Sequence, residues 1–118
     1  MILKSLTTLL SFFVISNAFA ADPANGKKLF VDHACNACHS VGNEGTARTG
    51  PNLAGVLQRR QRSWVKRWLK NPDKMRNDPI IQKMDSKYHS SMPNLGLSAS
   101  DIEDLLAYLA TAKAKNSR

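Results

Sequence analysis

The stretch that decides the fold is "DHACNACHSV", residues 32–41, in which Cys35 and Cys38 are separated by two residues and His39 follows directly. A thioredoxin-type redox dithiol would stand at the head of a helix in a strand-rich βαβ setting, and no strand pattern precedes Cys35. A structural zinc site usually takes two ligand pairs across a spacer, and only one pair is present. A disulfide between Cys35 and Cys38 would close a very tight loop.

Cys-x-x-Cys-His is also the sequence pattern of covalent c-type haem attachment. In such a site the two thiols add to the vinyl groups of the porphyrin, and the adjacent histidine reaches the iron from one face. The motif therefore favours one haem c, held through Cys35 and Cys38 with His39 as an iron ligand. The dithiol and zinc interpretations remain as alternatives.

The N-terminal 20 residues have the layout of a secretory signal peptide. Lys4 precedes an apolar run over residues 6–15, and a small-x-small site ends at Ala20. The apolar run is about half of the roughly 20 residues that a membrane-spanning helix needs, so a permanent anchor is the less favoured alternative. We expect cleavage after Ala20, a single domain over residues 21–118 and a periplasmic location, where haem attachment is also expected.

The expected mature chain is basic. Its 98 residues carry 16 basic and 9 acidic side chains, which gives a net charge of about +7. An exported protein with this balance is expected to meet acidic protein surfaces rather than nucleic acid, with at most transient contact with anionic lipid. We expect a monomer.

The patterning of the mature chain is helical, without alternating strand patterns. Expected helices cover residues 24–33 after Asp22-Pro23, 64–71 after Ser63 as cap, 80–88 after Asp78-Pro79, and a C-terminal segment after Ser98. In the last segment Asp101 completes a capping box with Ser98. An apolar stripe follows at helical spacing, formed by Ile102, Leu105, Leu106 and Leu109 with Tyr108 at its edge. Residues 40–55 are rich in glycine and read as a loop.

A haem iron also needs a ligand on its far face. The candidates are His33, Met75, Met84, His89 and Met92. Met92 is favoured because Pro93 follows it in a loop just before the C-terminal helix, where the chain can turn a thioether inward. Met75 and Met84 are expected in the core or at the surface, and His33 is expected to be exposed. His89 is the main competitor; a thioether would raise the reduction potential and a second imidazole would lower it.

The chain resembles the small monohaem class I cytochromes c over nearly all of its mature length. Four stretches carry the resemblance: "NGKKLFVDHACNACH", "TGPNLAGV", "MPNLGLS" and "DIEDLLAYL". It implies an all-α fold of three to five short helices around one haem, with the N- and C-terminal helices crossing. At that crossing Gly26 and Phe30 would meet Leu105 and Tyr108. Gly26 suits it because close backbone approach requires glycine.

The resemblance also implies roles around the haem. The carbonyl of Pro51 would accept a hydrogen bond from the His39 ring, which fixes the tautomer and raises the basicity of the imidazole. Arg59 falls where the family often has an arginine near a haem propionate, and Trp64 could supply an indole N–H in the same region. Trp68 is assigned to the core.

The middle of the chain is unusually basic. Between Arg59 and Arg76 there are eight basic residues and one acid, Asp73. The layout is similar to that of cytochrome domains fused to, or encoded beside, copper enzymes such as nitrous oxide reductase. A partner-docking face and an ordinary solvated helix face are equally good interpretations.

Taken with the resemblance, the sequence predicts a one-electron carrier rather than an enzyme, with His39 and Met92 filling both axial positions. It would shuttle electrons between periplasmic or membrane-bound redox partners. One alternative is a dedicated donor subunit or accessory cytochrome of a periplasmic oxidoreductase. The other is a haem sensor or enzyme, which requires that Met92 does not bind the iron.

Overall fold

The structure, a computed structural model, describes residues 20–46 and 48–114. Almost all of the expected signal peptide lies outside these residues. Five α-helices are seen within the described part: α1 (Pro23–Asp32), α2 (Val56–Arg59), α3 (Arg62–Lys70), α4 (Pro79–Tyr88) and α5 (Ala99–Thr111). Two short 3₁₀ turns, η1 (Cys35–Ala37) and η2 (Pro72–Met75), complete the order. The all-α prediction is confirmed.

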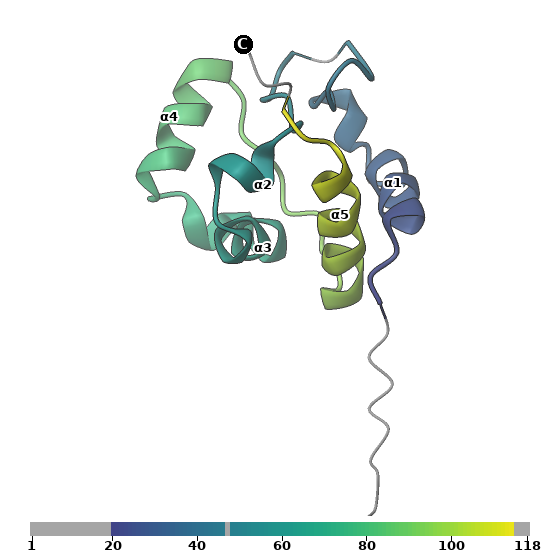
Figure 1. Ribbon diagram of the computed structural model, residues 1–118. Helices are drawn as coiled ribbons and strands as arrows, with labels where there is room; N and C mark the ends of the chain where they lie inside the picture. Colours follow the sequence, from purple (N-terminus) through teal and green to yellow (C-terminus); the bar gives the residue numbers. More distant parts are fainter. Residues whose placement is uncertain (1–19, 47, 115–118) are drawn as a thin grey trace, which may run out of the picture.

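The helices form two groups around the middle of the molecule (Figure 1). Helices α1 and α5 lie side by side in one group, and α2, α3 and α4 lie on the other side. The buried apolar side chains that join them come mainly from α5, and the stripe expected from its sequence is at the centre. This core consists of Phe30, Val41, Val65, Leu97, Ile102, Leu105, Leu106, Tyr108 and Leu109.

The contact between α1 and α5 depends on a glycine. A Cβ atom on Gly26 would lie 2.0 Å from the backbone oxygen of Asp104 and 2.8 Å from Cβ of Tyr108. No side chain fits in that space, so only glycine lets the two backbones approach this closely. One turn further along, the rings of Phe30 and Tyr108 meet edge to face with centroids 5.7 Å apart. The predicted meeting of the terminal helices is confirmed.

Side-chain caps fix where three helices begin. Oδ1 of Asp22 accepts hydrogen bonds from the backbone N–H groups of Ala24 and Asn25 at the start of α1. Asp78 accepts from Ile80 in α4, and Oγ of Ser98 accepts from Asp101 in α5. Each bond satisfies a donor that the first helical turn leaves unpaired.

The prediction that Ser63 caps the second long helix is wrong. Helix α3 begins at Arg62, its N-cap is Gln61, and no side chain bonds the cap. In this position the guanidinium of Arg62 and the ammonium of Lys66, one turn apart, both pair with Glu103 of α5. These ion pairs join α3 to α5.

Within residues 20–46 and 48–114, none of the helices combines the length and the apolar character that a bilayer crossing requires.

Candidate functional site

A single tight turn carries the two thiols and the imidazole. Helix α1 ends at Asp32, and Ala34 then takes a left-handed conformation with φ of 55°. For a residue other than glycine this conformation is uncommon, and here it redirects the chain into η1. The backbone N–H groups of Cys38 and His39 both bond the carbonyl of Cys35, at 3.2 and 2.9 Å. All three side chains of the motif therefore project from one turn.

The two cysteines are free and half-buried. Burial raises the pKa of the Cys35 thiol above its usual value, with the nearby Cys38 adding to the effect and a backbone hydrogen bond opposing it.

The ring of His39 is fixed by the loop that faces it. Its Nδ1 atom lies 2.8 Å from the carbonyl oxygen of Pro51, which is the contact that the family resemblance predicts. A carbonyl can only accept, so Nδ1 carries the proton and Nε2 keeps a free lone pair in the neutral ring. Burial lowers the pKa of His39, although the bond to Pro51 opposes this shift. The neutral, ligand-competent imidazole is favoured.

Next to this contact, Gly50 leaves room for the ring. A Cβ atom there would lie 2.7 Å from Cε1 and 2.9 Å from Nδ1 of His39. The Gly50-Pro51 pair thus has two separate functions. Gly50 makes space for the imidazole, and Pro51 supplies the acceptor.

The turn opens onto a largely apolar cavity of about 340 Å³. The size falls within the usual range for small-molecule and cofactor pockets. All seven residues that the sequence singled out line it: Cys35, Cys38, His39, Pro51, Arg59, Trp64 and Met92. Phe30, Leu53, Val65, Leu69, Ile80 and Leu105 are among its apolar wall residues.

Only some of the candidates for a second iron ligand line the cavity. Met92, Met84 and His33 line it, whereas Met75 and His89 do not. His89 instead ends α4 in a left-handed conformation and is exposed. The expectation that His33 is exposed needs correction, because the turn after α1 leaves its side chain half-buried in the cavity wall.

Arg59 and Trp64 are already engaged with protein atoms. The guanidinium of Arg59 donates to the carbonyls of Ala54 and Asn52 at 2.7 and 3.0 Å. The indole N–H of Trp64 donates to Asp78 at 3.0 Å, and this bond is the main reason that the pKa of Asp78 is lowered. Trp64 therefore lines the cavity while its N–H donates to the residue that caps α4.

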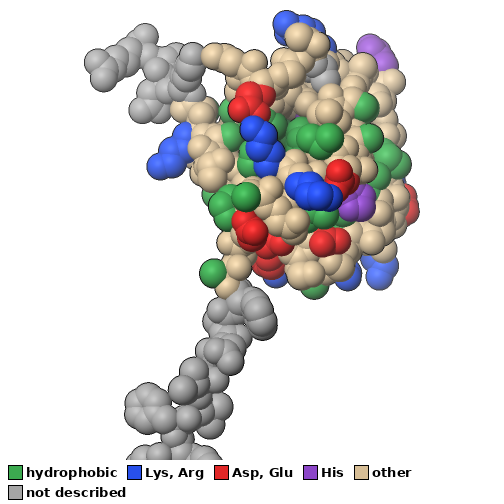
Figure 2. Space-filling model, turned by 90° about the vertical axis from the view of Figure 1, so that its right-hand side faces the viewer, with side chains coloured by type: hydrophobic (Ala, Val, Ile, Leu, Met, Phe, Trp, Pro, Cys, Tyr) green, Lys and Arg blue, Asp and Glu red, His purple; other side chains and the backbone are tan. Residues whose placement is uncertain are grey.

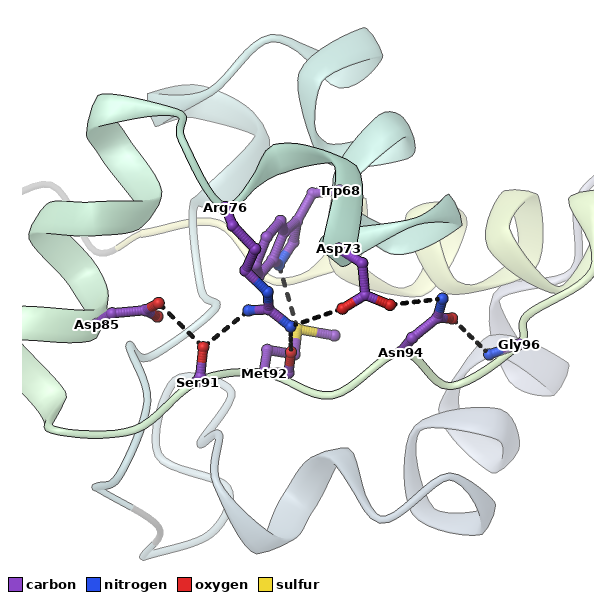
Figure 3. A network of polar contacts seen from close by, with 8 residues as sticks. All are labelled: Trp68, Asp73, Arg76, Asp85, Ser91, Met92, Asn94 and Gly96. Atoms are coloured by element: carbon purple, nitrogen blue, oxygen red, sulfur yellow. Dashed lines mark hydrogen bonds and ion pairs between the residues drawn. The ribbon is translucent and has the colours of Figure 1, made fainter.

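Sequence reasoning missed two residues that contact Met92. Trp68 had been assigned to the core, yet its indole N–H donates to the thioether sulfur of Met92 (Figure 3). Arg76 had been counted only as part of the basic stretch, and it donates to the carbonyl of Met92. The one available signal was that Trp64 and Trp68, four residues apart, share a helix face.

These residues fit a covalently bound haem. Two thiols, a neutral imidazole with Nε2 free, and a thioether border one apolar cavity. Thioether, imidazole and thiol are the side chains that c-type haem chemistry uses.

A family model described as "Cytochrome c" matches residues 23–113, a range that contains every site residue described above. Among solved structures, a cytochrome c from Rhodothermus marinus is similar with a TM-score of 0.67 and 27% sequence identity, over 76% of this chain and 75% of that chain. The cytochrome c domain of the pp3183 protein from Pseudomonas putida has a TM-score of 0.62 and 34% identity, over 73% of this chain and 85% of that chain.

Proposed function

The chain belongs to the cytochrome c family, whose members are generally electron carriers, and we propose that it carries one electron at a time with His39 and Met92 as axial iron ligands. One haem c is attached covalently through the Cys-x-x-Cys pair. The observation that carries the proposal is that Cys35, Cys38, His39 and Met92 all border the same cavity.

The haem supplies the one-electron chemistry, because its iron changes oxidation state without a change of ligands. The polypeptide sets the conditions for that change. Pro51 holds the His39 ring in the tautomer that leaves Nε2 free. The apolar wall keeps water from the metal and disfavours extra charge. A thioether ligand and a low-polarity wall both raise the reduction potential.

With His39 and Met92 both bound, the iron would have no open position for a substrate. This is why we propose a carrier and not an enzyme. Arg59 and Arg60 line the cavity, and their guanidinium groups are suited to the carboxylates of the haem edge. Arg59 keeps donors beyond the two that it gives to Ala54 and Asn52.

We further propose acidic redox proteins as partners. The face that carries α1 shows basic and acidic side chains next to one another (Figure 2), in keeping with the ion pairs Lys27–Glu44 and Lys28–Asp32. Much of the basic stretch is also occupied, since Glu103 holds Arg62 and Lys66. Five cations of this stretch make no ion pair with the described residues: Arg59, Arg60, Arg67, Lys70 and Lys74. Of these, Arg67, Lys70 and Lys74 do not line the cavity.

Arg67, Lys70 and Lys74 would steer an acidic partner, with an association rate that falls as salt rises. A periplasmic location and a monomeric state complete the proposal. The location rests on the signal-peptide pattern of residues 1–20, almost all of which lie outside the described residues.

Carbon monoxide binding to the reduced protein tests the carrier assignment. A carrier with both axial positions filled shows no change in its ferrous absorption spectrum at neutral pH when the gas is added. It also takes up and releases one electron per haem reversibly. A carbon monoxide complex formed at neutral pH would contradict the carrier and favour the haem sensor or enzyme.

A further inference from the structure

Two donors from different parts of the chain hold Met92 (Figure 3). The indole Nε1 of Trp68, on α3, lies 3.1 Å from the thioether sulfur. The guanidinium Nη2 of Arg76, just after η2, lies 2.7 Å from the backbone oxygen of the same residue. Met92 itself is in the loop between α4 and α5, where no helix fixes its backbone.

Trp68 is itself held by contacts with two other side chains. Its ring is stacked against Trp64, with centroids 6.4 Å apart and planes inclined by 16°. The guanidinium carbon of Arg76 lies 5.5 Å from the centroid of the Trp68 ring. These two contacts restrict the movement of the ring whose N–H donates to Met92.

Arg76 joins three segments through its planar fork. Nη1 donates to Oγ of Ser91 at 2.8 Å, and Nη2 is also 3.2 Å from a carboxylate oxygen of Asp73. The hydroxyl of Ser91 in turn donates to Asp85 of α4 at 2.9 Å. Arg76 therefore ties η2 and the start of the Met92 loop together, and through Ser91 it reaches α4.

We propose that Trp68 and Arg76 are positioning residues for Met92, acting on its sulfur and its backbone respectively. The inference rests on the proposed ligation of iron by Met92. A thioether sulfur has two lone pairs. The Trp68 N–H occupies one of them, so the other remains for the metal, and its direction is set. Arg76 fixes the backbone carbonyl of Met92, which lowers the entropy lost when the sulfur binds.

Imidazole competes with Met92 for the ferric iron, so its apparent Kd measures how firmly Trp68 and Arg76 hold Met92 in place. Imidazole binds only when Met92 leaves, so a weaker hold gives a lower apparent Kd. Trp68→Phe keeps the stack and removes the N–H; we expect its Kd to fall about threefold to tenfold, the factor that one net hydrogen bond supplies. Arg76→Lys keeps the charge but loses the fork; we expect a similar or larger fall, because charge-assisted bonds are stronger. Arg67→Lys, an exposed arginine outside the cavity, is the matched control and keeps the wild-type Kd.

The near-infrared sulfur-to-iron charge-transfer band separates the two effects. A hydrogen bond to sulfur lowers the energy of its lone-pair electrons, so Trp68→Phe should move the band to longer wavelength. Arg76→Lys should leave it in place, because Arg76 contacts the carbonyl and not the sulfur. A general loss of packing would not distinguish the variants in this way. Arg67→Lys, the control outside the cavity, should keep the band at the wild-type position.

Each result decides the question. Kd values in Trp68→Phe and Arg76→Lys equal to wild type, with the band present in wild type, overturn this proposal and leave the ligation by Met92 intact. A band that is absent in wild type overturns both, because Met92 then does not bind the iron. If Trp68→Phe does not take up haem, Arg76→Lys decides alone, since its side chain is 33% exposed and tolerates the change.

Discussion

The ring of His39 lies against the backbone of Gly50 so closely that a single added methyl group would collide with it. The Cβ position of Gly50 is 2.7 Å from Cε1 and 2.9 Å from Nδ1, the atom that donates to the carbonyl of Pro51 at 2.8 Å. One side of the ring is therefore limited by sterics, and its orientation is fixed by a hydrogen bond. Contacts with Gly50 and Pro51 therefore position His39, the proposed iron ligand, without help from the cofactor.

Replacing Gly50 tests this positioning. Gly50→Ala should push the imidazole away and break the bond to Pro51, and loss of such an outer contact typically weakens a metal ligand by about 10- to 100-fold. We expect a fraction of high-spin haem in the ferric absorption spectrum. Arg48→Ala, exposed in the same loop, should stay low-spin. A fully low-spin Gly50→Ala protein would show that the close contact does not constrain the ligand.

The start of α5 depends on Ser98. Its Oγ accepts a hydrogen bond from the backbone N–H of Asp101 at 3.1 Å. Ser98→Ala should lower the free energy of unfolding by about 1 kcal/mol, as measured by denaturant titration. Ser63→Ala is the matched control: Ser63 is exposed within α3 and does not cap it, so a change within about 0.5 kcal/mol is expected. Equal losses in the two variants would contradict the assigned caps.

The ion pairs of Glu103 give stability that depends on pH. Hydrogen bonds from Lys66 and Arg62 hold the pKa of Glu103 below its usual value. Because the folded pKa is lowered, the contribution is complete above the unfolded pKa of about 4.3 and is lost as the pH falls through the folded value. Glu103→Gln should therefore lower the free energy of unfolding by up to about 1 kcal/mol at pH 7.

The difference between wild type and Glu103→Gln should shrink below about pH 4 and at high salt. A difference that grows toward acid pH would contradict this account of the pair. The same substitution frees Arg62 and Lys66, so it should also speed association with an acidic redox partner. Lys28→Gln breaks an ion pair within α1 instead. It shows what the loss of a pair away from Arg62 and Lys66 does to the same association rate.

Local signals allowed much of the fold to be predicted from the sequence. Asp22 with Pro23 and Asp78 with Pro79 mark helix starts, and the apolar spacing of α5 marks the core. Helix α2 was missed because four residues are too few to show a period. Helix α3 begins at Arg62, and its N-cap Gln61 makes no side-chain bond, so no local capping signal marks this start.

For the candidate site, the local motif and the family resemblance indicated His39, Pro51 and Met92, and the structure brings these residues to one cavity. Trp68 and Arg76 were not predicted. Their contacts with Met92 span 24 and 16 residues along the chain. No local pattern predicts that Trp68 donates to the thioether of Met92 while Trp64 donates to the carboxylate of Asp78.

The most direct test of ligation by His39 and Met92 is the absorption spectrum of the oxidised and reduced protein, compared with Met92→Ala. The account predicts a low-spin c-type spectrum with a near-infrared sulfur-to-iron band that disappears in Met92→Ala. Met75→Ala, a methionine outside the cavity, should retain the band. A wild-type protein that lacks the band and whose ligand field is unchanged in Met92→Ala would contradict the account.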